Sequence, residues 1–462
     1  MRWIVFALIC AFTAPSLAVE PQLSVGFGEC DVSPAIGKKP VYLAGFTADR
    51  TATKIHDPIM ARAIALNDGT KTIALVSVDL IGLFLPTVEQ VRKELKGFDY
   101  ILVSSTHNHE GPDTLGLWGK TRFQSGTDPD YLEQVERGII KAVIVAQKSL
   151  TPATAKIGTA KAPELLHDAR LPEVKHDELV AIHFDSPAGN TLGVLVQWNC
   201  HPETLDDQNR EVSADFVGYA AAYVAKKYSC PAIYFTGTVG GLMTSLKVPI
   251  RDDKGIELKD GTFEKTAAYG RAVGSLTEKA IGQSVEAKLV PFEIRTQEIL
   301  VPVENGLYKI ASQLGVLQRP FYAWAGSPNP KEFVLSKDVI KPVGVKTEVG
   351  LLKLGSLDIA AIPGEIYPEL VVGGVQDPSD AGADYPDAPI EPLIYAGLKN
   401  KHKMLIGLAN DELGYFIPKR QWDVKPPYCY KLKESQYGEL NSCGPDAAKV
   451  VCEAFRALVE KK

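Results

Sequence analysis

The segment Ile101–Asp113 constrains this chain most, because an apolar run ends there in two closely spaced histidines, His107 and His109. The apolar part predicts a buried strand, and the Gly-Pro pair that follows predicts a turn. In an extended backbone, residues two positions apart point to the same face, so both imidazoles would project together into a cleft. Only eight histidines occur in the chain, and a strand end of this kind is a typical way to present metal ligands.

A second apolar run ends in the same manner. Leu192–Trp198 leads into Asn199-Cys200-His201-Pro202, so that a third histidine also lies between a predicted strand and a proline turn. Two such strand ends predict one shared metal site. The alternative is that these are loop histidines whose rings bond to backbone carbonyl groups.

Two more strand ends carry oxygen ligands. Glu365 follows Pro363-Gly364, and Tyr415 follows the apolar run Met404–Ala409. Two imidazoles, a carboxylate and a phenol oxygen suit Zn²⁺, which would lower the pKa of a bound water and polarise a carbonyl group. Alternatively, Glu365 is an acid at a helix N-terminus and Tyr415 is a half-buried aromatic residue beside a turn.

The first eighteen residues predict a signal peptide. Arg2 precedes the apolar stretch Trp3–Phe12, and Ser16-Leu17-Ala18 is a cleavage signal that would leave Val19 as the mature N-terminus. The apolar stretch is too short for a comfortable membrane span, and no later run is long enough. We therefore expect an exported protein, periplasmic or extracellular, without a transmembrane segment.

The remaining composition predicts one large domain over residues 19–462, since neither a repeat nor a low-complexity linker interrupts it. A net charge of −6 and a pI near 5.9 argue against nucleic-acid binding.

Six cysteines would remain after the signal peptide is removed. Cys429 and Cys443 could close a short loop, but the sequence leaves the disulfide pairing open.

Hairpins and helices alternate along the chain. Met60–Asn67 and Lys71–Leu80 flank the turn signal Asp68-Gly69, and a long helix is predicted from Asp128 to Lys148. This mixture predicts an α/β (mixed α+β) fold, a large single catalytic domain whose mixed sheets are flanked by helices. Val301–Lys346 is less regular and is a candidate lid or substrate wall.

The motifs of common hydrolases and nucleotide-binding proteins are missing, namely HExxH, GxSxG and the P-loop. The order of the motifs that are present resembles instead the N-terminal catalytic domain of the neutral/alkaline (non-lysosomal) ceramidase family. The matching segments run through the whole mature chain: Val25-Gly26-Phe27-Gly28, His56-Asp57-Pro58, Val76-Ser77-Val78-Asp79, Thr106-His107-Asn108-His109, Asn199-Cys200-His201-Pro202, Ser213-Ala214-Asp215-Phe216, Pro363-Gly364-Glu365, Gly407-Leu408-Ala409-Asn410 with Tyr415, and Tyr437-Gly438.

This resemblance implies a zinc-dependent amidohydrolase that acts on a ceramide-like lipid, and hence a place in sphingolipid metabolism. His109 would face the scissile amide, and Arg170 would contact the substrate. Together they would stabilise the oxyanion or carry a proton to the leaving amine. An alternative for Arg170 is a surface arginine in a loop. The implied zinc ligands are His107, His201, Glu365 and Tyr415.

Two departures from the family pattern bear on the substrate. The turn Gly240–Thr244 lacks the acid and the serine of the family, which puts ceramide binding in doubt. Glu110 replaces a usual serine, and we expect it to add a negative charge at the cleft mouth, favouring a smaller or cationic amide. The expected partner is thus a small-molecule or lipid amide, and peripheral membrane contact is compatible with it. The sequence does not indicate the oligomeric state.

Two other functions stay open at this point. One is a metal-dependent esterase or phosphoesterase, and the other is a non-catalytic binding protein with the same fold.

Overall fold

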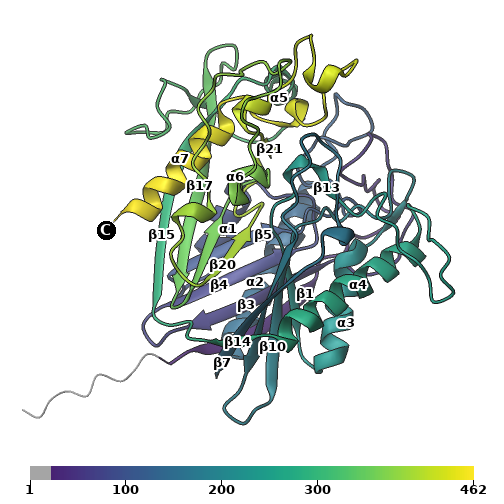
Figure 1. Cartoon of the computed structure of the whole chain (residues 1–462), viewed down its shortest axis with the longest axis vertical. Coiled ribbons are helices and arrows are strands. Elements are labelled where there is room, and N and C mark those ends of the chain that lie inside the picture. Colours follow the sequence, from purple (N-terminus) through teal and green to yellow (C-terminus); the bar gives the residue numbers. More distant parts are fainter. Residues whose placement is uncertain (1–21, 462) are drawn as a thin grey trace, which may run out of the picture.

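The computed structural model describes residues 22–461. The signal peptide predicted over residues 1–18 lies outside this range. Three five-stranded sheets form the framework of the described part (Figure 1). The first has the order β5 (Tyr100–Ser105), β4 (Thr72–Val78), β3 (Met60–Asn67), β1 (Ser24–Asp31) and β6 (Thr151–Pro152).

The second sheet runs in the order β12 (Ala232–Thr236), β10 (Thr191–Trp198), β9 (Glu178–Asp185), β7 (Thr154–Lys161) and β14 (Val285–Ala287). The third runs β15 (Phe292–Val303), β17 (Val343–Leu354), β18 (Leu357–Ala361) and β20 (His402–Ile406), with β16 (Tyr322–Ala323) paired to β17. Each sheet mixes antiparallel pairs with one parallel pair: β4–β5, β10–β12 and β18–β20.

The three sheets share one apolar core. Ile64 and Leu102 of the first sheet, Ile182 and Phe235 of the second and Ile359 of the third all belong to it, and each is at most 2% exposed. The sheets thus bury one face against each other, and their opposite faces need helices to cover them.

Helices cover these outer faces (Figure 1). The helices α1 (Leu85–Glu94) and α2 (Pro129–Lys148) pack on the first sheet. On the second sheet lie α3 (Asp215–Tyr228) and α4 (Phe263–Gly282), and α7 (Ala447–Glu460) lies on the third. Two shorter helices, α5 (Gly306–Gln313) and α6 (Glu369–Val372), lie near the third sheet's loops.

Three two-stranded pairs complete the described elements: β2 (Lys54–Ile55) with β11 (Glu211–Val212), β8 (His167–Asp168) with β13 (Met243–Thr244), and β19 (Glu365–Ile366) with β21 (Tyr415–Phe416). The last two pairs hold segments of the site described below.

The predicted fold class is confirmed, and so are several of its elements. The hairpin at Asp68-Gly69 joins β3 to β4, and α2 begins at Pro129. Its start is encoded locally: the Asp128 side chain accepts a hydrogen bond from the Asp130 N–H, and proline is favoured in the first turn.

One expectation needs correction. The region Val301–Lys346 is more regular than expected, since it contains α5, β16 and parts of two twelve-residue strands, β15 and β17. The structure also decides the disulfide pairing that the sequence left open: Cys429 and Cys443 are not bonded, and all six cysteines within residues 22–461 are free thiols. Among the described helices, none has the length and apolar character that a membrane span requires.

Strand β1 packs so closely on α2 at Gly28 that a side chain at this position would destabilise the fold. A Cβ atom there would lie 2.2 Å from the backbone oxygen of Ala142 in α2. This oxygen is part of the helix backbone, so the clash could be relieved only by a shift of the helix. We expect Gly28→Ala to lower the free energy of unfolding by about 1–3 kcal/mol. Gly282 at the end of α4 is the matched control, since nothing lies within 4 Å of its Cβ position. Gly282→Ala should be neutral or slightly stabilising in the same urea titration, and equal effects of both changes would contradict the packing argument.

Candidate metal centre and pocket

The carboxyl ends of strands from all three sheets meet at one place. Backbone hydrogen bonds connect the segments that follow them: Asn410 donates to Val103 O at 2.7 Å, and Gly407 donates to Thr236 O at 2.9 Å. Ile362, after β18, donates to Ile406 O at 3.0 Å. Because these bonds join distant segments directly, side chains projecting from the strand ends have fixed relative positions.

Three histidines come together at this point. The ring centroids of His107 and His201 lie 4.9 Å apart, and that of His109 lies 5.1 Å from the first and 5.6 Å from the second. One nitrogen from each ring lies within 4.8 Å of the others, and all three residues are buried. The two predicted strand ends therefore share a site.

Backbone carbonyl groups orient two of the rings. The Nδ1 atom of His107 lies 2.7 Å from Ile81 O, and that of His201 lies 3.0 Å from Met243 O. Since a carbonyl oxygen only accepts, each Nδ1 carries a proton, and in the neutral ring each Nε2 has a free lone pair. Such a carbonyl bond on the far nitrogen is typical of histidines that bind metals. The alternative that these histidines bond to backbone carbonyl groups is thus correct for Nδ1 of each ring. The Nε2 atom of each ring is still available to bind a metal.

The Glu365 carboxylate lies close to the Nε2 atoms of both His107 and His201. Its Oε2 atom lies 3.1 Å from Nε2 of His107 and 3.0 Å from Nε2 of His201. The residue lies on β19, so it is not at a helix N-terminus. Although burial opposes ionisation, the two imidazoles hold the pKa of Glu365 below its usual value.

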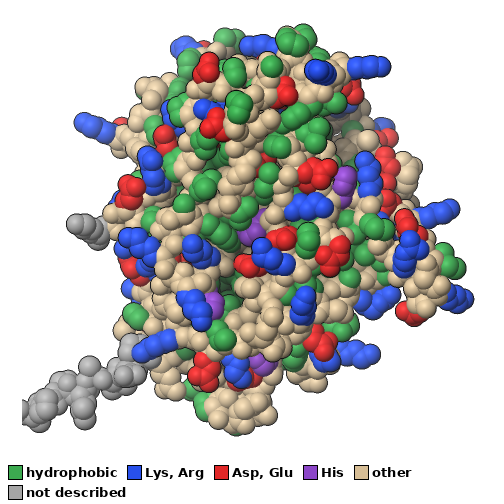
Figure 2. Space-filling view, in the orientation of Figure 1, with side chains coloured by type: hydrophobic (Ala, Val, Ile, Leu, Met, Phe, Trp, Pro, Cys, Tyr) green, Lys and Arg blue, Asp and Glu red, His purple; other side chains and the backbone are tan. Residues whose placement is uncertain are grey.

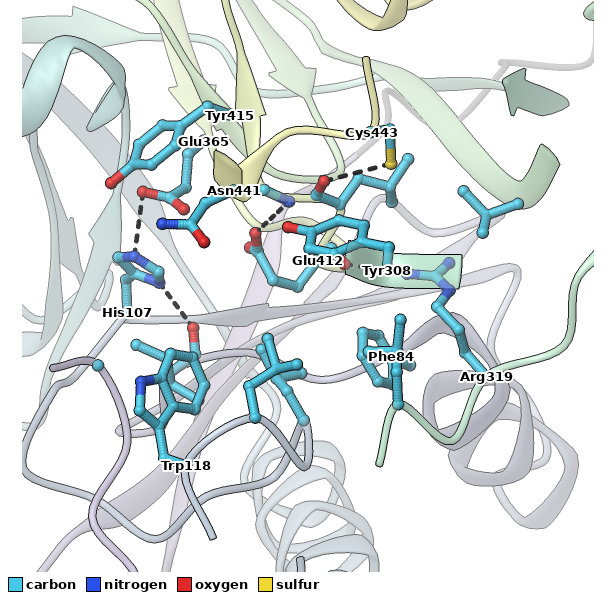
Figure 3. A pocket seen from close by; sticks show the side chains of 18 of the residues that line it. Phe84, His107, Trp118, Tyr308, Arg319, Glu365, Glu412, Tyr415, Asn441 and Cys443 are labelled. Atoms are coloured by element: carbon cyan, nitrogen blue, oxygen red, sulfur yellow. Dashed lines mark hydrogen bonds and ion pairs between the residues drawn. The ribbon is translucent and has the colours of Figure 1, made fainter. Parts of the chain in front are cut away.

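Tyr415 lies directly opposite Glu365, because the parallel pair β19–β21 places the two residues in register. Figure 3 shows its hydroxyl group beside the Glu365 carboxylate. Burial, and then the negative charge of Glu365, raises the pKa of Tyr415 well above its usual value. A nearby cation would have the opposite effect and favour the phenolate.

His109 differs from the other two histidines. Neither of its ring nitrogens has a hydrogen-bond partner within the described part of the chain, and its nearest carboxylate is Glu203, 3.5 Å from Nδ1. The ring packs edge-on against Phe46, and a Cβ atom at Gly45 would lie 2.3 Å from its Cγ. Burial, and then the charges of His107 and His201, lowers the pKa of His109 well below its usual value. The site therefore holds a neutral, positioned imidazole with free nitrogens.

The donor set fits a divalent metal ion. Neighbouring ligands of tetrahedral zinc, each about 2.0–2.1 Å from the metal, stand about 3.3 Å apart. The observed separations of 3.0 and 3.1 Å between Glu365 and the two Nε2 atoms need little change to reach this spacing. These residues thus form a buried cluster that could bind a metal, with Tyr415 next to it.

A pocket of about 690 Å³, including its mouth, opens beside this cluster (Figure 3). His107, His109, Glu365 and Tyr415 line its inner end. Five of its wall residues come from the predicted lid or wall segment Val301–Lys346. The apolar part of the wall is formed by Ile81, Phe84, Leu115, Leu117, Trp118, Leu317, Phe321, Val345 and Leu413.

Arg170 is not among the residues that line this pocket. Its guanidinium group forms a buried bidentate ion pair with Glu439, at 2.7 and 2.9 Å, and donates to the backbone oxygens of Tyr437 and Gln421. The arginine is therefore neither a surface residue nor next to the histidines. It fixes the segment that carries Tyr437, which does line the pocket, and its predicted contact with substrate stays a prediction.

The sequence predicted that Glu110 lies at the cleft mouth, and this prediction is wrong. Glu110 is fully buried, and its carboxylate lies 2.6 Å from both Arg50 Nη2 and Asn209 Nδ2. A buried carboxylate needs such partners, and its charge is compensated inside the domain. Glu110 therefore supplies no negative charge for a substrate.

The turn Gly240–Thr244 acts through its backbone. It supplies the Met243 oxygen that orients His201, and Gly240 packs so closely on Tyr367 that a Cβ atom would lie 2.3 Å from its ring. The loss of the acid and serine side chains therefore does not affect how the turn holds His201.

Three residues of the site had no role in the sequence analysis. Glu203 follows the His201-Pro202 pair, Gly45 faces His109, and Glu412 lines the pocket. Proximity to the predicted histidine motif could have indicated Glu203. Nothing in the sequence relates Gly45 or Glu412 to the histidines.

Comparisons with known proteins agree with the motifs. Residues 23–242, slightly less than half of the chain, match the family model "Neutral/alkaline non-lysosomal ceramidase, N-terminal". Neutral ceramidase A of Dictyostelium discoideum is 24% identical over 205 residues, which are 38% of this chain but only 28% of that protein. The family resemblance inferred from the sequence is confirmed.

Solved structures extend the similarity of fold over nearly the whole chain. A crystal structure of neutral ceramidase from Pseudomonas aeruginosa superposes with a TM-score of 0.71 at 14% identity, covering 96% of this chain and 74% of that one. A ceramidase complexed with C2 gives a TM-score of 0.69, also at 14% identity, over 95% and 75% of the two chains.

Substitution of the clustered histidines should remove a bound metal. We expect His107→Ala and His201→Ala each to weaken metal binding by more than about a hundredfold, because each removes an Nε2 donor. His183 on β9 is the matched control, since its Nε2 bonds to Thr191 Oγ1 at 3.0 Å, away from the cluster. Elemental analysis after dialysis measures the result, and equal loss of metal in all three variants would mean that the site is misplaced.

Proposed function

Because the motifs, the fold and the buried cluster all agree with the neutral/alkaline ceramidases, we propose that this protein is a zinc-dependent hydrolase of N-acyl amides. One observation carries the proposal. The Nε2 atoms of His107 and His201 and the carboxylate of Glu365 converge at about 3 Å, beside a pocket into which the unpartnered His109 also faces.

In this proposal His107, His201, Glu365 and Tyr415 hold the zinc ion. Bound zinc supplies a Lewis acid that lowers the pKa of water and polarises a carbonyl group. The carbonyl oxygens of Ile81 and Met243 keep the two imidazoles in the orientation and tautomer that this requires.

His109 performs the proton transfers. As a neutral imidazole with free nitrogens it accepts a proton from the attacking water as the O–C bond forms, and it donates that proton to the amide nitrogen as the C–N bond breaks. The Glu203 carboxylate, 3.5 Å from Nδ1, stabilises the protonated ring between the two steps. The products are a carboxylic acid and an amine, and the acid's proton passes to the amine, which leaves as an ammonium ion beside the carboxylate.

The apolar wall of the pocket supports an amide with a hydrocarbon part. Aromatic and aliphatic side chains from five segments of the chain, including Phe84, Trp118 and Phe321, line it and would bury an acyl chain. A small or lipid amide is therefore the substrate class of this proposal. Export of the protein, by the signal peptide predicted over residues 1–18, is part of the same proposal.

A substrate panel tests the function. Purified protein is assayed on N-acyl amides, including a short-chain ceramide, and on carboxylic and phosphate esters, with and without a chelator. We expect amide hydrolysis that the chelator abolishes and added zinc restores. Faster cleavage of an ester class would instead identify an esterase or phosphoesterase, and bound metal without any turnover would identify a binding protein.

The role of His109 has its own test, because this histidine also lies close enough to the others to be a metal ligand. If it transfers protons, His109→Ala should lower kcat by about 10²–10⁴-fold while the zinc content stays unchanged. Amide hydrolysis and elemental analysis on the same sample measure both quantities. Loss of zinc in this variant would show that His109 is a ligand instead.

A further inference from the structure

One acidic side chain of the pocket, Glu412, has no role in the proposed reaction. Glu412 lines the pocket wall and is only 6% exposed. Its Oε1 atom accepts a hydrogen bond from the Gly414 N–H at 2.7 Å, whereas Oε2 is buried and has no partner anywhere in residues 22–461. Such an unpaired buried carboxyl oxygen is costly and needs an explanation.

No cation of the described residues forms a hydrogen bond or ion pair with the Glu412 carboxyl group. Arg319 is the one arginine or lysine among the described residues that line the pocket, and its Nη2 is paired with Asp411 Oδ2 at 2.9 Å. Its Nη1 donates to the backbone oxygen of Glu412 at 3.0 Å, and its guanidinium group lies over the ring of Phe84. Arg319 therefore holds the main chain of Glu412 in place while leaving its carboxyl group free.

The position of the Glu412 side chain is also fixed from the other side. A Cβ atom at Gly82 would lie 2.9 Å from Cβ and Cγ of Glu412, so the backbone at Gly82 packs against the stem of the glutamate. Figure 3 shows the carboxyl group between Asn441 and Tyr308, on the same pocket that Glu365 and His107 line. Burial, and then the charge of Glu365, raises the pKa of Glu412 well above its usual value.

We propose that Glu412 recognises a primary ammonium group of the substrate, and that the preferred substrate is an N-acyl amide with both an apolar part and a positive charge. An ammonium group supplies the hydrogen-bond donor and the charge that the free Oε2 lacks. This inference rests on the proposed function only for the position of the bond that is cleaved. Glu412 is then a specificity residue, distinct from the metal ligands.

A binding measurement tests this without turnover. Hexylammonium and 1-hexanol are titrated into the full-length, metal-containing protein by calorimetry. We expect the cation to bind at least about tenfold more tightly, since a hydrogen bond to a charged group is stronger than one between neutral groups. Equal affinity, or tighter binding of the alcohol, would overturn the inference, and the wild-type protein is sufficient for this measurement.

Glu412→Gln should lower the preference for the cation by roughly tenfold to a hundredfold while the metal content stays the same. Glu391→Gln is the matched control. Glu391 is also a buried glutamate with one oxygen on a backbone N–H, that of Lys419, and the other unpartnered within the described residues, but it does not line this pocket. A similar loss in both variants would overturn the assignment to Glu412.

A substrate pair separates this inference from the proposed function. N-acylhexylamine and the mono-N-acyl derivative of 1,6-diaminohexane differ only by a terminal ammonium group. A higher kcat/KM for the charged amide, reduced in Glu412→Gln, supports the inference. Turnover of both at equal kcat/KM would overturn the inference but leave the hydrolase function intact. Cation-selective binding without turnover of either would support the inference and contradict the hydrolase.

Discussion

The buried contact between Glu365 and two imidazoles is the interaction on which the site depends. A single carboxylate oxygen lies within 3.1 Å of the Nε2 atoms of His107 and His201, and the Nδ1–H group of each ring donates a hydrogen bond to a backbone carbonyl oxygen. Without a cation, two nitrogen lone pairs and a carboxylate oxygen would face one another in a buried space, which is unfavourable unless protons or a metal ion intervene. The fold therefore brings together groups that a positive charge stabilises, either a proton on an imidazole or a metal ion, and a metal ion would satisfy both nitrogens and the carboxylate together.

The three sheets explain how such a contact can be held. Each sheet contains one parallel strand pair, and the carboxyl ends of these pairs meet where Asn410 and Gly407 bond to the main chains of β5 and β12. Because backbone hydrogen bonds fix these ends, the histidines and the glutamate need no flexible loop to bring them together. Preorganisation of this kind matters for catalysis, since groups that are already placed require no rearrangement during the reaction.

The sequence was most informative where the signal is local. An apolar run that ends in a histidine before a proline turn identifies a strand end, and Asp128-Pro129 identifies the start of α2, because neighbouring residues determine both. It failed where a distant residue decides the outcome. Glu110 was expected at the cleft mouth, but Arg50, sixty positions earlier, pairs with it inside the domain. Likewise, the backbone at Gly45 fixes the ring of His109, although no pattern connects the two.

The partners of two buried acidic residues, Glu110 and Glu412, then distinguish their roles. Glu110 does not line the pocket, and its Oε2 has Arg50 and Asn209 as partners, although its Oε1 has none among the described residues. Within the described residues, the Glu412 carboxyl group has only the Gly414 N–H as a hydrogen-bond partner, because the neighbouring Arg319 is already paired with Asp411. A buried acid whose second oxygen is free and lines the pocket is stabilised most by a bound donor that carries positive charge. The proposal of a cationic amide therefore rests on Glu412 and not on Glu110, and only the folded chain reveals the partners of Glu412.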